Sequence, residues 1–102
     1  MEIVKIFISD LIRIKPKVFQ DERGYFMESF KENFFKENFP HIKFIQDNES
    51  KSNYGVLRGL HFQKPPFEQT KLVRVISGKV LDIAVDLRAG SSTFGKYLSI
   101  EL

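Results

Sequence analysis

Apolar and polar residues alternate along much of the chain at the two-residue period of a β-strand. Near the N-terminus Val4, Ile6 and Ile8 share one parity and a lysine takes the other, which predicts a strand. The letters DERG at residues 21–24 are a turn signal, and the segment YFMESF that follows them, at residues 25–30, is predicted as a strand. Several short strands separated by turns at regular intervals predict an all-β sandwich or barrel.

One segment has helical rather than strand spacing. Ser29 can cap a helix that starts near Phe30, two further phenylalanines follow at helical spacing, and Pro40 ends the segment. We therefore predict a single short helix near residues 30–38, with its phenylalanines packed in the core.

The segment TKLVRVISGKVLDIAVDLR, residues 70–88, predicts a β-hairpin that turns at Ser77-Gly78. One face of this hairpin would be almost wholly apolar, and the other would mix Lys71 and Asp82 with small apolar residues. The mixed face is either the solvent side of a one-sided sheet or the wall of a polar cavity. The pattern alone does not choose between these two interpretations.

A second polar pattern covers residues 46–52, which are also predicted to be extended. Gln46, Asn48, Ser50 and Ser52 share one parity, and the residues of the other parity are all charged. The neutral face predicts either an exposed edge strand or the lining of a ligand cavity, where amides and hydroxyls orient a polar ligand.

Composition narrows the class of protein. A chain of 102 residues is expected to form a single domain, residues 1–102, and a net charge of +3 without a run of like charges does not indicate nucleic acid. The absence of cysteine excludes disulfides and thiolate chemistry. Charged residues interrupt the apolar N-terminus and no long apolar run exists, so we expect a cytoplasmic protein with no membrane partner.

The chain has two histidines, His41 and His61, which are too far apart in the sequence for a typical metal site. His61 lies between two cations, Arg58 and Lys71. An imidazole titrates near neutral pH, and nearby cations favour its neutral, proton-accepting form. Either His61 is a structural strand residue, or it is a base that removes a proton next to a carbonyl while an ammonium stabilises the oxygen.

The catalytic interpretation requires Arg58 and His61 to lie on the same face of their strand. Arg58 and His61 are three residues apart, so a plain strand would send them to opposite faces. A bulge at Gly59 would bring them to one face.

Four segments, taken together, resemble the dTDP-4-dehydrorhamnose 3,5-epimerase family. They are FQDERGYFMESF, FIQDNESKS, GVLRGLHFQKPP and KLVRVISGKVLDIAVDLRAGSSTFGKY, and the resemblance is collinear from about Lys15 to the last residue. The resemblance implies the N-terminal portion of a cupin-type jelly roll, incomplete relative to the family. It also implies a homodimer that needs no metal or organic cofactor and takes a dTDP-sugar as its small-molecule substrate.

The resemblance further implies roles for individual residues. His61 matches the base that removes protons at C3 and C5 of a 4-keto-6-deoxy sugar, in dTDP-L-rhamnose biosynthesis, and Lys71 matches the lysine near the keto oxygen. Asp82 is a candidate supporting group behind them. The positions that match nucleotide-sugar contacts, some of them contributed across the family's dimer, are Arg23, Glu28, Gln46, Asn48 and Arg58.

The resemblance also implies that two groups of the family site have no counterpart here. They are the tyrosine that acts as general acid and the aspartate that orients the base, because Tyr25, Tyr54 and Tyr97 do not align with that acid. One alternative is therefore a truncated, catalytically impaired module that binds the nucleotide sugar. Another is a β-sheet oligomerisation domain that binds no small molecule.

Overall fold

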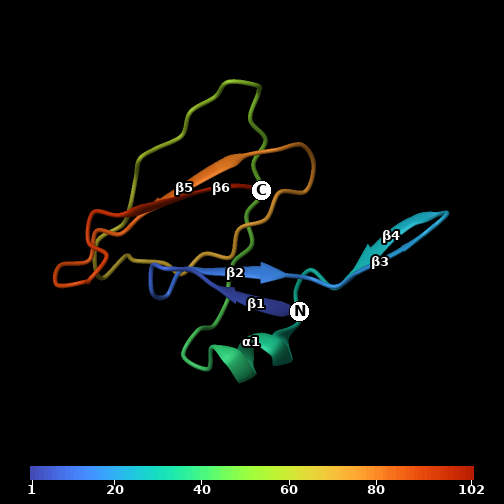
Figure 1. The fold of residues 1–102 in the computed structure, drawn as a ribbon, viewed down its shortest axis with the longest axis horizontal. Helices are drawn as coiled ribbons and strands as arrows, with labels where there is room; N and C mark the ends of the chain where they lie inside the picture. Colours follow the sequence, from blue (N-terminus) through green and yellow to red (C-terminus); the bar gives the residue numbers. More distant parts are fainter. The chain divides into compact units, whose positions relative to one another are not determined.

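The computed structural model describes residues 1–102 and contains three antiparallel strand pairs and one short helix (Figure 1). The prediction of a β-rich chain with one helix is confirmed. The chain divides into two compact units, one formed by residues 1–31 and 73–102 and the other by residues 32–72. All three strand pairs belong to the first unit, and the helix belongs to the second.

The first strand pair joins β1 (Glu2–Lys5) and β2 (Ile12–Lys15). In this register Glu2 lies opposite Lys15, which places opposite charges on neighbouring strands at the open end of the pair. Ile8, in the connection between the strands, is one of the two buried apolar residues of the chain. The alternation near the N-terminus therefore predicted a strand correctly, although the strand ends before Ile8.

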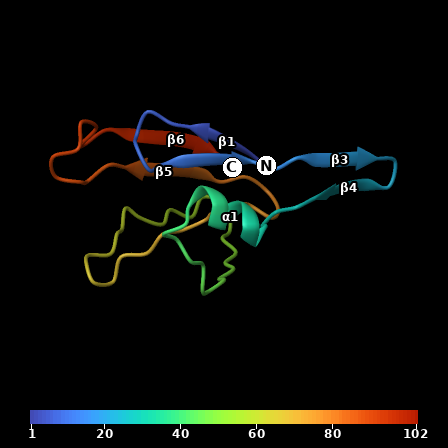
Figure 2. The same cartoon turned by 90° about the horizontal axis from the view of Figure 1, so that it is seen from below.

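The second pair joins β3 (Val18–Asp21) and β4 (Gly24–Met27) through a two-residue turn at Glu22 and Arg23. The turn and the strand after it are as predicted. Gly24 has φ +132°, a conformation that L side chains rarely adopt, which explains glycine at the first position of β4. Figure 2 shows this pair as a ribbon of its own, and most of its side chains are exposed.

The third pair joins β5 (Leu81–Val85) and β6 (Tyr97–Glu101). Two backbone hydrogen bonds between Val80 and Leu102, of 3.1 and 2.9 Å, extend the ladder at its open end. The covered face of this ribbon carries alternate residues of each strand, and these are Asp82, Ala84, Leu98 and Ile100.

The hairpin predicted at residues 70–88 is wrong. Residues 71–80 form no strand, and β5 pairs with β6 instead of with the segment before it. Ser77-Gly78 indicates only a local bend. Which strands pair depends on all the cross-strand contacts of the ladder, and a turn signal carries no information about them. The two faces predicted for β5 also differ from those observed. The apolar Leu81 is exposed, whereas Asp82, on the opposite face, is partly buried.

Helix α1 (Glu32–Asn38) confirms the predicted helix and begins two residues later than expected. Phe35 is buried, and its ring meets those of Phe34, Phe39 and Phe44 at centroid distances of 5.4, 6.0 and 5.3 Å. The first and last of these contacts are edge-on, which is the favourable arrangement for aromatic pairs. The helix is therefore held by an aromatic cluster, as its phenylalanine spacing indicated.

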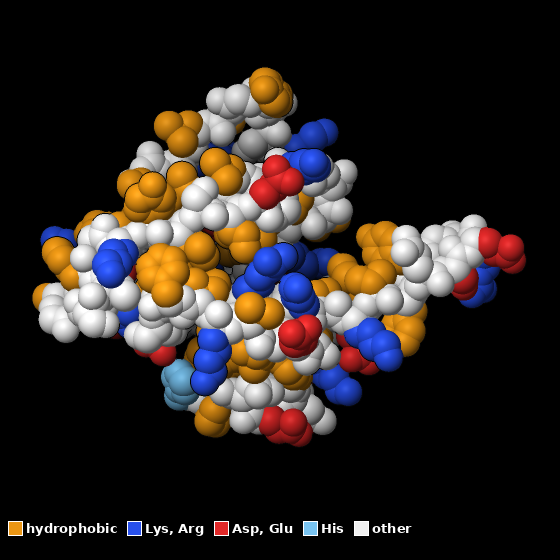
Figure 3. All heavy atoms as spheres, viewed as in Figure 1, with side chains coloured by type: hydrophobic (Ala, Val, Ile, Leu, Met, Phe, Trp, Pro, Cys, Tyr) orange, Lys and Arg blue, Asp and Glu red, His pale blue; other side chains and the backbone are white.

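Residues 39–72 contain no strand, so the strands predicted around residues 46–52 and at His61 are wrong. A strand needs a hydrogen-bonded neighbour, and the backbone bonds in this segment are local turns such as Phe67 N–H to Lys64 O at 2.8 Å. Large apolar side chains are consequently exposed, and many appear on the surface in Figure 3. Those of this segment include Ile45, Tyr54, Leu57, Leu60, Phe62 and Phe67.

Candidate functional site

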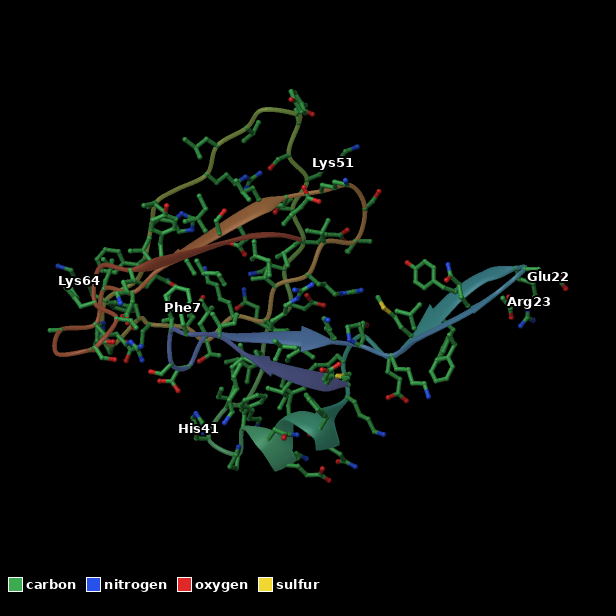
Figure 4. The ribbon with its side chains drawn as sticks, in the orientation of Figure 1. Phe7, Glu22, Arg23, His41, Lys51 and Lys64 are labelled. Carbon is green, nitrogen blue, oxygen red and sulfur yellow. The ribbon has the colours of Figure 1, made fainter.

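Arg23 lies in the turn of the β3–β4 ribbon, at its far end (Figure 4). Asp21 holds it: Nη2 donates to Oδ2 at 2.7 Å, Nε donates to the same oxygen at 3.2 Å, and the Arg23 backbone N–H donates to Oδ1 at 2.9 Å. The guanidinium and this backbone N–H lower the pKa of Asp21, and the carboxylate raises the pKa of Arg23. Arg23 keeps these hydrogen bonds although its side chain is 87% exposed.

Glu28 follows β4 directly and is exposed to solvent. Its carboxylate lies 4.0 Å from the ammonium of Lys31, three residues further along the chain. Such a long, solvent-exposed ion pair contributes little to stability. Glu28 is therefore free to accept a hydrogen bond from a ligand.

Gln46 and Asn48 interact with each other, as their shared parity suggested. The Gln46 side-chain N–H donates to the Asn48 side-chain oxygen at 3.1 Å. No strand forms here, yet these two side chains, two residues apart, reach each other. The pair offers neutral donors and acceptors to a polar ligand.

Arg58 is fixed by the chain that precedes it. Its Nε donates to the hydroxyl of Ser52 at 3.0 Å, and its Nη2 donates to the carbonyl of Lys51 at 3.5 Å. Neither partner is anionic, so the positive charge of Arg58 remains available for an anionic ligand.

His61 and Lys71 lie in the same unit as Arg58, and both are exposed. Gly59, two residues before His61, has φ +128°, and a Cβ placed there would lie 3.7 Å from His61 Nδ1. The predicted bulge is not present because there is no strand to bulge. Gly59 adopts a backbone conformation that favours glycine, between Arg58 and His61.

The predicted site residues are divided between the two units. Arg23, Glu28 and Asp82 belong to the first unit, and the other predicted site residues, which are Gln46, Asn48, Arg58, His61 and Lys71, belong to the second. Asp82 is half-buried on β5, opposite Ile100. The structure thus brings the proposed base, the proposed ammonium and three polar contacts into one unit.

Sequence reasoning missed a polar cluster in the β5–β6 connection. The Asp86 side chain is only 1% exposed and accepts hydrogen bonds from Arg88 Nε at 3.0 Å, from Ser91 Oγ at 2.6 Å and from Thr93 Oγ1 at 2.7 Å. Arg88 first, and then the two hydroxyls, hold the pKa of Asp86 far below its usual range. The letters DLRAGSST were the available signal, because aspartate, serine and threonine bond to nearby backbone in turns.

Arg88 also ties this connection to the one between β1 and β2. Its Nη1 lies 3.0 Å from Asp10 Oδ2, and its Nη2 donates to the carbonyl and hydroxyl of Ser9 at 3.0 and 3.2 Å. A hollow of about 260 Å³ lies between these two connections, lined by residues 8–11 and 84–88. It contains none of the predicted site residues, so we assign this cluster a structural role.

Two other classes of site find no support in the structure. No group of three or more histidine, cysteine, aspartate or glutamate side chains is arranged to hold a metal ion. The only helix has seven residues, too few to span a bilayer.

The chain is similar to known proteins over nearly its whole length. The family model of dTDP-4-dehydrorhamnose 3,5-epimerase matches residues 5–102. Proteins of that name from Shigella flexneri and Methanothermobacter thermautotrophicus are each 52% identical to the chain, over 100% and 97% of its length. The matches cover 57% and 53% of those proteins, so the chain spans about half the length of the curated relatives it matches.

Solved structures give the same result. The crystal structure of dTDP-4-dehydrorhamnose 3,5-epimerase from Elizabethkingia anophelis is 52% identical, with a TM-score of 0.87, over 100% of this chain and 56% of that one. That of dTDP-6-deoxy-D-glucose-3,5-epimerase from Legionella pneumophila, in complex with dTDP-4-keto-L-rhamnose, is 46% identical, with a TM-score of 0.89, over 99% and 54%.

A mainly β chain that superposes on these structures has a cupin-type fold, incomplete relative to the solved proteins. With the family model matching nearly its whole length, the chain belongs to the dTDP-4-dehydrorhamnose 3,5-epimerase family.

Proposed function

We propose that this chain carries the base of a nucleotide-sugar 3,5-epimerase, which inverts C3 and C5 of dTDP-4-keto-6-deoxyglucose on the route to dTDP-L-rhamnose. The observation that supports this most strongly is the collinear family match at 52% identity, which spans the RGLHFQ segment and the lysine after it. The proposed base and the proposed lysine belong to the same unit, which is compatible with the proposal.

The proposed chemistry is proton abstraction next to the C4 ketone. His61 takes the proton from C3. The electron pair of the broken C–H bond forms a C3=C4 double bond, and the π pair of the C4 carbonyl moves to its oxygen, which gives an enolate. The Lys71 ammonium stabilises that oxygen. Return of a proton to C3 from the opposite face inverts the centre, and the same steps at C5 complete the reaction. No redox group is needed, because no electron leaves the substrate.

Substrate binding is assigned to the remaining polar residues. Arg23 and Arg58 would contact the diphosphate, since a guanidinium presents paired N–H groups that match phosphate oxygens. Gln46 and Asn48 would supply neutral hydrogen bonds, and Glu28 would accept one. Asp82 is proposed as a supporting group of the site.

The assembly and location are part of the same proposal. Large exposed apolar side chains occur in both units, as expected of a chain that buries more surface in an assembly. We propose a homodimer, in a single-domain chain that works in the cytoplasm without a cofactor. Sedimentation at increasing protein concentration would reveal the dimer, and a chain that stays monomeric throughout would contradict it.

Solvent isotope exchange tests the catalytic proposal. In D2O the 102-residue chain should place deuterium at C3 or C5 of dTDP-4-keto-6-deoxyglucose, which mass spectrometry detects. His61→Asn should lower the exchange rate by about 10²- to 10⁴-fold, the usual contribution of a general base. The other histidine provides the matched control, because His41→Asn should leave the rate unchanged. Equal rates in both variants would show that the base is misassigned.

Calorimetric titration with dTDP separates the remaining alternatives. Binding that weakens in Arg58→Ala, without any exchange, would indicate a nucleotide-sugar binding module in place of an enzyme. No binding at all would favour an oligomerisation domain and would overturn the proposed function.

A further inference from the structure

In the turn of the β3–β4 ribbon, several hydrogen bonds from the exposed Arg23 go to a single carboxylate. Asp21 uses both carboxylate oxygens: Oδ2 receives Nη2 at 2.7 Å and Nε at 3.2 Å, while Oδ1 receives the backbone N–H at 2.9 Å and Nε at a longer 3.4 Å. Every one of these donors belongs to Arg23. A single carboxylate therefore fixes both the backbone and the side chain of one residue.

The hydrogen bonds to Asp21 engage only one edge of the Arg23 guanidinium. The Nε–Nη2 edge faces Asp21, while Nη1 donates to no atom of the chain. The side chain of Arg23 remains 87% exposed. A planar guanidinium held along one edge points its remaining N–H groups in a fixed direction, which suits paired contact with phosphate oxygens.

We propose that Asp21 is a positioning residue that orients Arg23 so that its open side meets the diphosphate of the nucleotide sugar. The inference rests on the proposed function, which assigns Arg23 to that diphosphate. Ordering Arg23 before the ligand arrives lowers the entropy lost on binding, because a free arginine side chain has many rotamers to give up.

Two simpler roles for Asp21 give different expectations. If Asp21 only closes the turn, asparagine should replace it without loss, because its side-chain oxygen still accepts the Arg23 N–H. If Asp21 acts only as a negative charge near the phosphates, its removal should tighten binding by relieving repulsion. A positioning role alone predicts weaker binding in Asp21→Asn.

Glu22 offers a matched control in the same turn. Its carboxylate is exposed and makes no hydrogen bond or ion pair in the structure. Glu22→Gln removes one negative charge beside Arg23, as Asp21→Asn does, and leaves the grip on the guanidinium intact.

The experiment measures dTDP affinity by calorimetry, and kcat and KM where turnover is present, in the 102-residue chain. In Asp21→Asn we expect Kd and KM to rise roughly two- to fivefold with kcat unchanged, the scale of an exposed, well-aligned ion pair. Glu22→Gln should bind as well as the parent chain or slightly better. Asp21→Ser, whose hydroxyl also accepts the turn N–H, should behave like Asp21→Asn, and thermal unfolding checks that each variant is folded.

A double variant shows whether Asp21 acts through Arg23. Asp21→Asn should add nothing to the loss caused by Arg23→Ala, and pyrophosphate alone should reproduce the pattern seen with dTDP. Unchanged or tighter dTDP binding in Asp21→Asn would overturn the positioning role while leaving the proposed function intact. Failure of the parent chain to bind dTDP would overturn both.

Discussion

Two Asp-X-Arg segments in the same unit share one local arrangement and differ in their surroundings. In Asp21-Glu22-Arg23 and in Asp86-Leu87-Arg88 the aspartate Oδ1 accepts the arginine backbone N–H, at 2.9 and 3.0 Å, and a carboxylate oxygen receives Nε. The first pair is exposed at the end of a ribbon, with Asp21 51% exposed. The second is covered, with the Asp86 side chain 1% exposed.

The difference shows how surroundings assign a role to a local motif. Asp86 has further donors in Ser91 and Thr93, and Arg88 reaches Ser9 and Asp10 in the connection between the first two strands. That network ties together segments far apart in the sequence. Asp21 has only Arg23, so its carboxylate can orient a side chain for a ligand without supporting the fold.

The largest expected effect is on stability. Asp86→Asn should lower the melting temperature by on the order of 10 °C, because it removes a buried charge that Arg88 and two hydroxyls are arranged to meet. Asp21→Asn should change it by no more than about 2 °C, since exposed pairs contribute little. Thermal unfolding followed by circular dichroism gives both values. Similar losses in the two variants would remove the distinction between the pairs.

The pH dependence of stability should follow the buried pair. The pKa of Asp86 is lowered in the folded chain, so its contribution is complete above the unfolded value of about 3.9 and is lost as the pH falls through the folded value. Below about pH 4 the unfolded chain binds the proton first, and the melting temperature should fall with pH. Asp86→Asn should flatten this slope between pH 4 and 2, as unfolding curves at several pH values would show. A slope unchanged in that variant would contradict the assignment.

A smaller effect is expected when the charge of Arg88 is kept and its shape is changed. Arg88→Lys preserves the cation and cannot reach Asp86, Asp10 and Ser9 at once, because an ammonium lacks the planar fork. We expect a loss of melting temperature of roughly half that of Asp86→Asn. A loss as large as that of Asp86→Asn would mean that the geometry of the fork, more than charge, carries the network.

The smallest effect should come from the exposed end of the same network. Asp10 is 90% exposed, and its contact with Arg88 is screened by water. Asp10→Asn should shift the melting temperature by no more than about 2 °C, and asparagine tolerates the φ of +67° found there. A large shift would show that the network extends further toward solvent than its burial indicates.

The sequence predicted those features that depend on neighbouring residues. The DERG turn follows from a glycine at a position with positive φ, and α1 follows from phenylalanine spacing and the proline beyond it. The shared side of Gln46 and Asn48 also follows from parity alone, even though no strand forms there. These features need no knowledge of distant partners.

Features that depend on distant partners were predicted wrongly or missed. The Ser77-Gly78 signal favoured a local hairpin, whereas β5 pairs with β6, which follows it after a connection of eleven residues. Nothing in the letters DLRAGSST says that Asp86 is buried or that Arg88 reaches Asp10. The roles of His61 and Lys71 came from resemblance to a family, and they remain predictions that the exchange experiment tests.

A carboxyl titration by carbon-13 NMR tests the central distinction most directly, because one sample reports both aspartates. We expect both Asp86 and Asp21 to have lowered pKa values and the shift of Asp86 to be much the larger, so that Asp86 stays ionised after Asp21 has taken up its proton. An Asp86 carboxyl that titrates together with Asp21, or at the ordinary value for aspartate, would contradict the distinction between the two Asp-X-Arg pairs.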